Sequence, residues 1–274
     1  MNGFMEKEKA RAFAAAQAAG AIIRAIYQTD YTVDYKGKDS PVTIADRDAN
    51  QRIHEILHDA FPTYGWLSEE TADSPTRLSC RRVWVVDPMD GTKEFIEKIP
   101  EFAVSIALIE DGKPVLGVAY NPIHDQLFWA VRGQGAWCAD RRLRVSQTDR
   151  LVNATILSSR SETKRGEWKD FVALFHTRPM GSIAYKLAII AGGEADASFT
   201  LVPKNEWDIC AGTLIVEEAG GTVTHLNGQP VVFNQPQTLL RGLVASNSVL
   251  HSQLLHLIAP RLATLPPVEP RKST

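Results

Sequence analysis

The sequence has few cysteines, no excess of positive charge and no apolar run long enough to cross a bilayer. Its three cysteines, Cys80, Cys138 and Cys210, are too few and too scattered for a disulfide framework or a zinc ribbon. Scattered reduced thiols are typical of the cytosol, and the charged residues 1–11 contain no signal-peptide core. We therefore expect a cytoplasmic protein without stable membrane insertion.

The overall charge excludes another class of function. The formal net charge is −2 and the isoelectric point is about 6.4, so there is no basic surplus to bind polymeric nucleic acid by counterion release. A pocket for one small nucleotide needs only a few local charges and is still allowed. The composition, with 44% hydrophobic and 23% charged residues, is that of a globular chain.

Several phosphate-handling motifs are also missing. No Walker A loop occurs, and the only Gly-x-Gly, at residues 133–135, lacks the third glycine of a dinucleotide fingerprint. We expect those glycines to form a hairpin turn instead. Phosphatases with an aspartate nucleophile need two aspartates separated by one residue, whereas Asp87 and Asp90 are separated by two.

Hydrophobic periodicity predicts blocks of helices and strands. Helices are expected over residues 4–28, 45–61 with Thr43 as N-cap, 182–191, 208–219 and 248–259. Strands are expected over residues 83–86, 103–109, 115–120, 127–131, 154–158, 197–201, 222–224 and 243–245. Residues 31–41 are predicted as a loop and residues 265–274 as a frayed tail.

The pattern of elements changes near residue 146. Before it, two helices precede a run of short strands, and after it strands and helices alternate. This change predicts an N-terminal α+β half, residues 1–146, and a C-terminal α/β half, residues 147–274.

Residues 84–92 join a strand-like run to two carboxylates. Asp87 and Asp90 follow the apolar run and flank Pro88, which stiffens the turn by fixing φ, and a Gly-Thr pair comes next. Carboxylate oxygens are ligands that Mg²⁺ prefers, and free N–H groups after Asp90 can hold an anion. Metal ligands beside an anion-binding turn suggest phosphate ester chemistry. The alternative is an Asx turn with both carboxylates in solvent.

Two further acidic pairs stand at element boundaries. Glu69 and Glu70 follow the apolar approach of residues 65–67, and Glu206 and Asp208 precede or open an expected helix. Each pair has a plain structural alternative, because the two glutamates could form an exposed turn and Asp208 could cap its helix. Three such clusters in one chain together favour a shared metal site.

Ordered segments of the chain resemble the inositol monophosphatase superfamily of lithium-sensitive, magnesium-dependent phosphatases. They are VTIAD (42–46), LSEE (67–70), WVVDPMDGT (84–92), GSIAYK (181–186), EWDICAG (206–212) and EEAGG (217–221). The resemblance extends over most of the chain. It implies the two-part αβαβα layered sandwich of the sugar phosphatases, with most metal ligands on the first half and Asp208 and the substrate side on the second.

Within this superfamily, the segment DGTKEFI (90–96) resembles the 3′(2′),5′-bisphosphate nucleotidases. Typical inositol monophosphatases carry Thr-Asn-Phe where this chain has Lys93-Glu94-Phe95. The resemblance implies hydrolysis of 3′-phosphoadenosine 5′-phosphate to AMP and phosphate. The alternatives are an inositol-1-monophosphatase or a broad polyol-phosphate phosphatase, and a non-catalytic metal- or phosphate-binding protein. The last is disfavoured because every acidic ligand and the pair of Thr92 and Asp46 are present.

The same resemblance implies a metal site and a base. Two or three Mg²⁺ ions are expected on oxygen ligands, namely Glu69, Asp87, Asp90, Asp208 and the backbone carbonyl of Met89. Thr92 is expected to orient and deprotonate the attacking water together with Asp46, since a threonine hydroxyl alone is a poor base. No covalent enzyme intermediate is required.

Substrate contacts implied by the resemblance lie on both halves. Gly91 and Thr92 are expected to hold the phosphate through their N–H groups. The organic part of the ester is expected at Gly181, Ser182 and Ala184.

A second phosphate would need cations away from the metals. The candidates are Lys93 and Lys186, with Arg160 as a third. Glu206 is expected either to meet a substrate hydroxyl or to face solvent. The partner is expected to be a small phosphorylated metabolite. Because homodimers are common in the superfamily, the resemblance also implies a homodimer.

Overall fold

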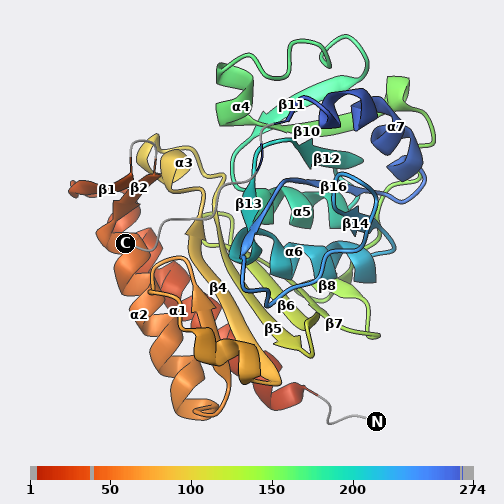
Figure 1. Ribbon diagram of the computed structural model, residues 1–274. Helices are drawn as coiled ribbons and strands as arrows, with labels where there is room; N and C mark the ends of the chain where they lie inside the picture. The colour runs from red at the N-terminus through yellow and green to blue at the C-terminus, as the bar shows by residue number, and fades with distance from the viewer. Residues whose placement is uncertain (1–4, 38–39, 266, 268–274) are drawn as a thin grey trace.

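The computed structural model describes residues 5–37, 40–265 and 267, and its elements stack in five layers (Figure 1). The layers are a helix pair, a sheet, a second helix pair, a second sheet and a final helix. This is the αβαβα sandwich that the motifs implied, so the predicted fold class is confirmed.

The first layer consists of α1 (Glu6–Tyr27) and α2 (Ile44–Ala60), which lie along one face of the large sheet (Figure 1). Both helices bury small or aliphatic side chains toward that sheet. Thr43 caps α2 as predicted, and its hydroxyl oxygen accepts from the N–H of Ala45 at 3.2 Å. Helical periodicity and capping chemistry thus suffice for this layer.

The second layer is a sheet of seven strands among the described residues. In spatial order they are β3 (Gly65–Ser68), β4 (Arg82–Asp90), β5 (Ala103–Glu110), β6 (Lys113–Asn121), β7 (Gln126–Val131), β8 (Ala136–Cys138) and β9 (Arg141–Arg142). β3 runs parallel to β4, and the later pairs are antiparallel. The predicted hairpin turn lies between β7 and β8, where the N–H groups of Gly133 and Gly135 donate to Glu218 at 2.8 and 2.9 Å.

The middle layer consists of α5 (Ile183–Ala191) and α6 (Glu206–Glu218), which are buried between the two sheets. Gly117 of β6 lets α6 approach closely, because a Cβ atom there would lie 2.7 Å from the carbonyl oxygen of Ala211. Gly212 of α6 likewise lets α6 pack closely against α5, since a Cβ atom there would lie 2.5 Å from the Leu187 side chain. These contacts fix α6, and with it Asp208, against the large sheet.

The fourth layer is a smaller sheet. In spatial order it contains β11 (His176–Met180), β10 (Thr155–Ser159), β12 (Ala197–Thr200), β16 (Leu243–Ser246) and β14 (Thr222–Thr224). β10 runs parallel to β11 and β12, and β16 is antiparallel to its neighbours. The outer helix α7 (His251–Leu262) packs on this sheet beside an aromatic cluster of Trp168, Phe171 and Phe199.

Short elements complete the described chain. They are α3 (Thr92–Ile96), α4 (Arg160–Lys164), β13 (Lys204–Asn205), β15 (Leu239–Leu240) and the 3₁₀ turns η1 (Pro75–Ser79) and η2 (Leu151–Asn153). None of these had a helical or strand prediction of its own, because segments this short carry too few residues for a periodic signal.

Two of the predicted segments need correction. Residues 31–41, predicted as a loop, contain β1 (Val33–Gly37), which pairs antiparallel with β2 (Ser40–Thr43). The segment is polar, and a two-stranded ribbon is held mainly by backbone hydrogen bonds that leave little trace in the side-chain pattern. The strand predicted for residues 83–86 continues to Asp90, since β5 still offers a partner at Ala103.

The two sheets fall on either side of residue 146, but one buried cluster contains residues from both sides, including Phe128 and Leu187. The division into residues 1–146 and 147–274 therefore stays a prediction. Most of the tail predicted to fray lies outside the described residues. Among the described residues, every helix is too short or too polar to serve as a membrane span.

The approach of α6 to β6 gives a stability prediction. Gly117→Ala places a methyl group against the α6 backbone, which cannot move aside as a flexible side chain can. Overpacking of this kind costs about 1–3 kcal/mol, so we expect a lower midpoint in urea unfolding.

Gly192→Ala is the matched control for this experiment. Its Cβ would meet its nearest neighbour at 3.4 Å, an ordinary contact, so the free energy of unfolding should change by less than about 0.5 kcal/mol. Equal midpoints for the two variants would contradict the close packing of α6 on β6.

Candidate active site

A β-bulge at the end of β4 aims two carboxylates into one cavity. Asp87 lies opposite Ser105 of β5 and Asp90 lies opposite Ala103, so three steps along β4 face two along β5. Side chains alternate along a regular strand, and the extra residue of the bulge turns Asp90 to the side of Asp87. The N–H of Met89 donates to Oδ1 of Asp87 at 2.9 Å and fixes the turn inside the bulge.

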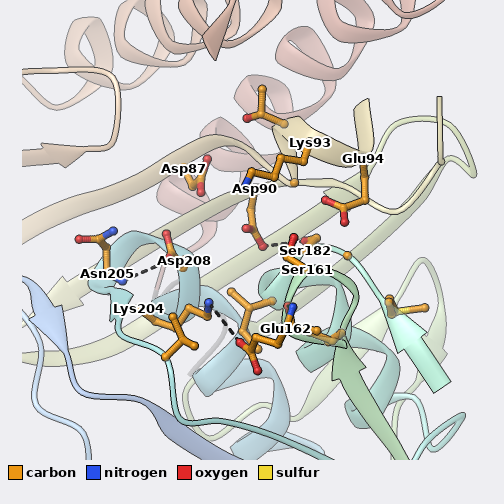
Figure 2. Close-up of a pocket in the computed structure, with 18 of the residues that line it drawn as sticks. Asp87, Asp90, Lys93, Glu94, Ser161, Glu162, Ser182, Lys204, Asn205 and Asp208 are labelled. Carbon is orange, nitrogen blue, oxygen red and sulfur yellow. Dashed lines mark hydrogen bonds and ion pairs between the residues drawn. The ribbon is translucent and has the colours of Figure 1, made fainter. Parts of the chain in front are cut away.

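The cavity measures about 400 Å³ and is lined by acidic side chains from both halves of the chain (Figure 2). Glu69 follows β3, Asp87 and Asp90 stand on β4, and Asp208 lies in the first turn of α6. The structure thus brings together all the predicted metal ligands, Met89 included.

These carboxylates stand close enough to affect one another. The pKa of Asp87 is raised by burial first and then by the charges of Glu69, Asp90 and Asp208. Burial, followed by the charges of Asp90 and Glu69, raises the pKa of Asp208 to about 8. The full set of carboxylates cannot be ionised at neutral pH unless a cation offsets the repulsion.

The donor set fits a hard divalent cation. The acidic side chains offer oxygen atoms, which Mg²⁺ prefers, rather than the nitrogen and sulfur ligands typical of zinc. In the described residues, no three acidic, histidine or cysteine side chains already close around one point, so the carboxylates line the cavity rather than form a complete cage. Mg²⁺ usually keeps several waters in its shell and does not need a cage made of protein.

Hydrogen-bond donors already hold one carboxylate oxygen of Asp90 and one of Asp208. Oδ2 of Asp90 accepts from the hydroxyl of Ser182 and from the N–H of Ala184, both at 2.6 Å. Oδ2 of Asp208 accepts from the N–H of Asn205 at 2.9 Å, at the start of α6. The remaining oxygens are left for a ligand in the cavity.

Glu69 differs from the other carboxylates, because a cation from the β1–β2 hairpin reaches it. Nζ of Lys36 lies 3.0 Å from Oε1 of Glu69 and 2.5 Å from Oε1 of Glu70. Burial works to lower the pKa of Lys36, but the two glutamates outweigh it, so this pKa is raised. The segment predicted as a loop therefore brings a positive charge to the acidic cluster.

Thr92 and Asp46, the predicted base, are hydrogen-bonded to each other. The hydroxyl of Thr92 donates to Oδ1 of Asp46 at 2.9 Å, and Oδ2 of Asp46 accepts from the N–H and the hydroxyl of Thr43, both at 2.7 Å. Asp46 is 1% exposed, and burial raises its pKa to about 6. A carboxylate held in this way orients the hydroxyl of Thr92, which lines the cavity.

Gly91 brings the backbone before α3 close to the cavity. Its φ of 107° favours glycine, and a Cβ atom there would lie 2.9 Å from Cβ of Phe102. Gly91 and Thr92 both line the cavity. Their N–H groups are therefore placed at a turn where an anion can bind.

The residues predicted to contact substrate divide into two groups. Gly181 and Ser182 line the cavity, whereas Ala184 lies outside it and donates its N–H to the carboxylate of Asp90. Lys93 and Lys186 line the cavity as well. Lys186 is 3% exposed, burial lowers its pKa to about 8, and its ammonium has no hydrogen-bond or ion-pair partner among the described residues.

Two other predicted substrate residues lie outside the cavity. Glu206 is 1% exposed, and its carboxylate accepts from the N–H groups of Asn234 at 2.7 Å and Gln235 at 2.8 Å. It neither faces solvent nor lines the cavity, and instead anchors a loop. The guanidinium of Arg160 pairs with Glu101 at 2.5 Å, which leaves it unsuited to the role of third cation.

Sequence reasoning missed three charged residues of the cavity wall. Lys204 and Arg165 line the cavity, and Glu162 lies beside Lys204 with Oε1 3.8 Å from its Nζ (Figure 2). The same Oε1 accepts from the hydroxyl of Thr200 at 2.6 Å. Lys204 directly precedes the acidic segment 205–208, and this position in the sequence could have identified it as a residue of the site. Nothing local in the sequence distinguishes Glu162 or Arg165.

Known proteins are similar to this sequence over most of its length. A model of the Inositol monophosphatase family matches residues 5–263. An inositol-1-monophosphatase of Mesorhizobium japonicum is 38% identical over 239 residues, which cover 84% of this chain and 87% of that protein.

Solved structures share the fold. The extragenic suppressor protein suhB from Bartonella henselae superposes with a TM-score of 0.80 at 36% identity, covering 90% of this chain and 96% of that one. CysQ from Bacteroides thetaiotaomicron, described as a bacterial member of the inositol monophosphatase family, gives 0.74 at 30% identity, covering 90% and 99%. On the strength of the family match and these relatives, the chain belongs to the inositol monophosphatase family, whose members are phosphatases.

Proposed function

We propose that this protein is a Mg²⁺-dependent phosphomonoesterase that hydrolyses a small phosphorylated metabolite with a water nucleophile. The observation that carries the proposal is one cavity lined by six carboxylates, four of which are the predicted metal ligands, and by a hydroxyl that a further, buried carboxylate holds. Two or three Mg²⁺ ions would be held by Glu69, Asp87, Asp90, Asp208 and the carbonyl of Met89. Sensitivity to Li⁺ belongs to the same proposal.

The chain's own residues supply the proton path and the anion contacts. Bound Mg²⁺ would polarise the phosphate and lower the pKa of a coordinated water. Thr92, oriented by Asp46, accepts a hydrogen bond from the attacking water and relays its proton to that carboxylate. The N–H groups of Gly91 and Thr92 hold the phosphate oxygens. The water oxygen bonds to phosphorus as the ester P–O bond breaks, and the leaving oxygen takes a proton from solvent.

The proposed substrate is a nucleoside 3′,5′-bisphosphate such as 3′-phosphoadenosine 5′-phosphate. Besides the resemblance of residues 90–96, support comes from Lys186, because a buried ammonium without a partner is costly and a second phosphate would relieve it. Lys204 adds a cation to the cavity wall, 3.8 Å from Glu162. Lys93 adds another, and it is exposed and free to swing toward a ligand.

The rival substrate is inositol 1-phosphate or another polyol phosphate. Several of the curated relatives carry the name inositol-1-monophosphatase, and this support is at least as strong as that for a nucleotide. A monophosphate, however, would leave the Lys186 ammonium without a second phosphate as its partner.

A comparison of substrates decides between the two. We expect kcat/KM for 3′-phosphoadenosine 5′-phosphate to exceed that for inositol 1-phosphate at least tenfold, about 1.4 kcal/mol of differential transition-state binding. Lys186→Met should shrink this ratio, since it keeps the apolar stem and removes the charge. The exposed Lys113, on the start of β6, gives the control Lys113→Met, which should leave the ratio unchanged. Equal or better turnover of inositol 1-phosphate would favour the rival.

The proposed base gives a kinetic prediction. Thr92→Ala should lower kcat by roughly 10²–10⁴-fold, the usual effect of losing a general base, while Mg²⁺ affinity stays close to that of the wild type. The measurement is kcat and KM at saturating Mg²⁺, with the exposed Thr29→Ala as a control. A raised KM with an unchanged kcat would make Thr92 a binding residue instead.

The proposed metal site gives a further prediction. Asp90→Asn keeps the shape of the side chain but removes a negative charge from the cluster, so most activity should be lost and Mg²⁺ should bind much more weakly. The fold should be retained, as judged by thermal unfolding. The exposed Asp140→Asn serves as the control. Normal turnover of the Asp90→Asn protein at low Mg²⁺ would count against the site.

A further inference from the structure

Ser182 has an unusual backbone conformation at the edge of the cavity. Its φ is 48° and its ψ is 116°, a combination that residues with a Cβ atom rarely adopt. The residue is only 7% exposed. Strain of this kind persists only where the surrounding contacts hold the residue in place, and it is concentrated at functional sites.

The strained backbone directs the Ser182 hydroxyl at a β4 carboxylate. The hydroxyl donates to Oδ2 of Asp90 at 2.6 Å, across 92 positions of sequence (Figure 2). Its oxygen in turn accepts from the N–H of Tyr185 at 3.0 Å, as the N-cap of α5. The N–H of Ala184 donates to the same Oδ2 at 2.6 Å. Two donors thus occupy one oxygen of Asp90, which lines the cavity, and leave its Oδ1 without a hydrogen bond among the described residues.

The residue before Ser182 is held just as firmly. The N–H of Gly181 donates to Oε2 of Glu101 at 2.9 Å, and that carboxylate is paired with Arg160 at 2.5 Å. A Cβ atom on Gly181 would lie 2.2 Å from the Glu94 side chain, so the segment runs directly against the first half of the chain. These contacts account for the retention of the strained conformation.

We infer that Ser182 is a positioning residue for Asp90, which it holds so that the free oxygen is offered to a divalent cation. The family resemblance assigned Ser182 only to the organic part of the substrate, and the hydrogen bond to Asp90 gives it a different task. Groups that orient a metal ligand typically change metal affinity by 10–100-fold when removed. The inference rests on the proposed metal site.

The test measures Mg²⁺ binding in the absence of substrate, by titration calorimetry, together with KM at saturating Mg²⁺. Ser182→Ala removes the hydroxyl, and we expect the dissociation constant for Mg²⁺ to rise about tenfold while KM changes less than about threefold. Ser182→Gly also removes the hydroxyl but relieves the backbone strain. It should be at least as stable as Ser182→Ala and should still bind Mg²⁺ about tenfold more weakly, which a merely structural role would not produce.

Ser198→Ala is the matched control, since Ser198 is buried and its hydroxyl donates one hydrogen bond, to the carbonyl of Leu157 at 2.7 Å. Its Mg²⁺ affinity should equal that of the wild type. An unchanged Mg²⁺ affinity in Ser182→Ala, with a raised KM, would overturn the inference and leave Ser182 as a substrate contact. A wild-type protein that neither binds Mg²⁺ nor hydrolyses a phosphate ester would instead overturn the proposed function, and the inference with it.

Discussion

Electrostatic repulsion among carboxylates in one cavity is the constraint on which the rest of this structure depends. Taking a carboxylate out of water is costly unless it is paired or hydrogen-bonded, yet Asp87, Asp90 and Asp208 meet where β4 approaches α6. Stability alone does not favour such an arrangement. The chain must hold these side chains in place by packing, and under the proposed function a cation would offset their charge.

The packing requirement is met mainly by α6. Gly117 brings the backbone of this helix onto β6, and Gly212 brings α5 against it. Glu206 anchors the start of the helix to residues 234–235 through two hydrogen bonds. Because Asp208 lies two positions further on, its carboxylate cannot retreat from Asp87 without breaking these contacts. Glu206 thus serves the site through the helix that carries Asp208, rather than by touching a ligand in the cavity.

Local patterns were enough to predict α1, the strands β5–β7 and the cap at Thr43, since each depends on residues a few positions apart. The acidic clusters were also predictable, because each stands at the end of an element. The cavity wall that faces these acidic clusters was not predictable from the sequence. The hydrogen bond between Thr200 and Glu162 spans 38 positions, and the one between Gly181 and Glu101 spans 80. No periodicity records such contacts, so this wall was the least predictable part of the cavity.

Under the proposed function, the charges in the cavity would also impose an order on the binding of metal and substrate. A phosphate ester is an anion, and carboxylates without a cation among them repel it. The basic side chains of the same cavity attract the ester, but the carboxylates that line the cavity outnumber them. Lys36 already neutralises part of the charge of Glu69. Under the proposed function, divalent cations would therefore bind before the ester or together with it. The metal would then form part of the surface that recognises the phosphate, which would explain why a cavity for an anion is lined with acids.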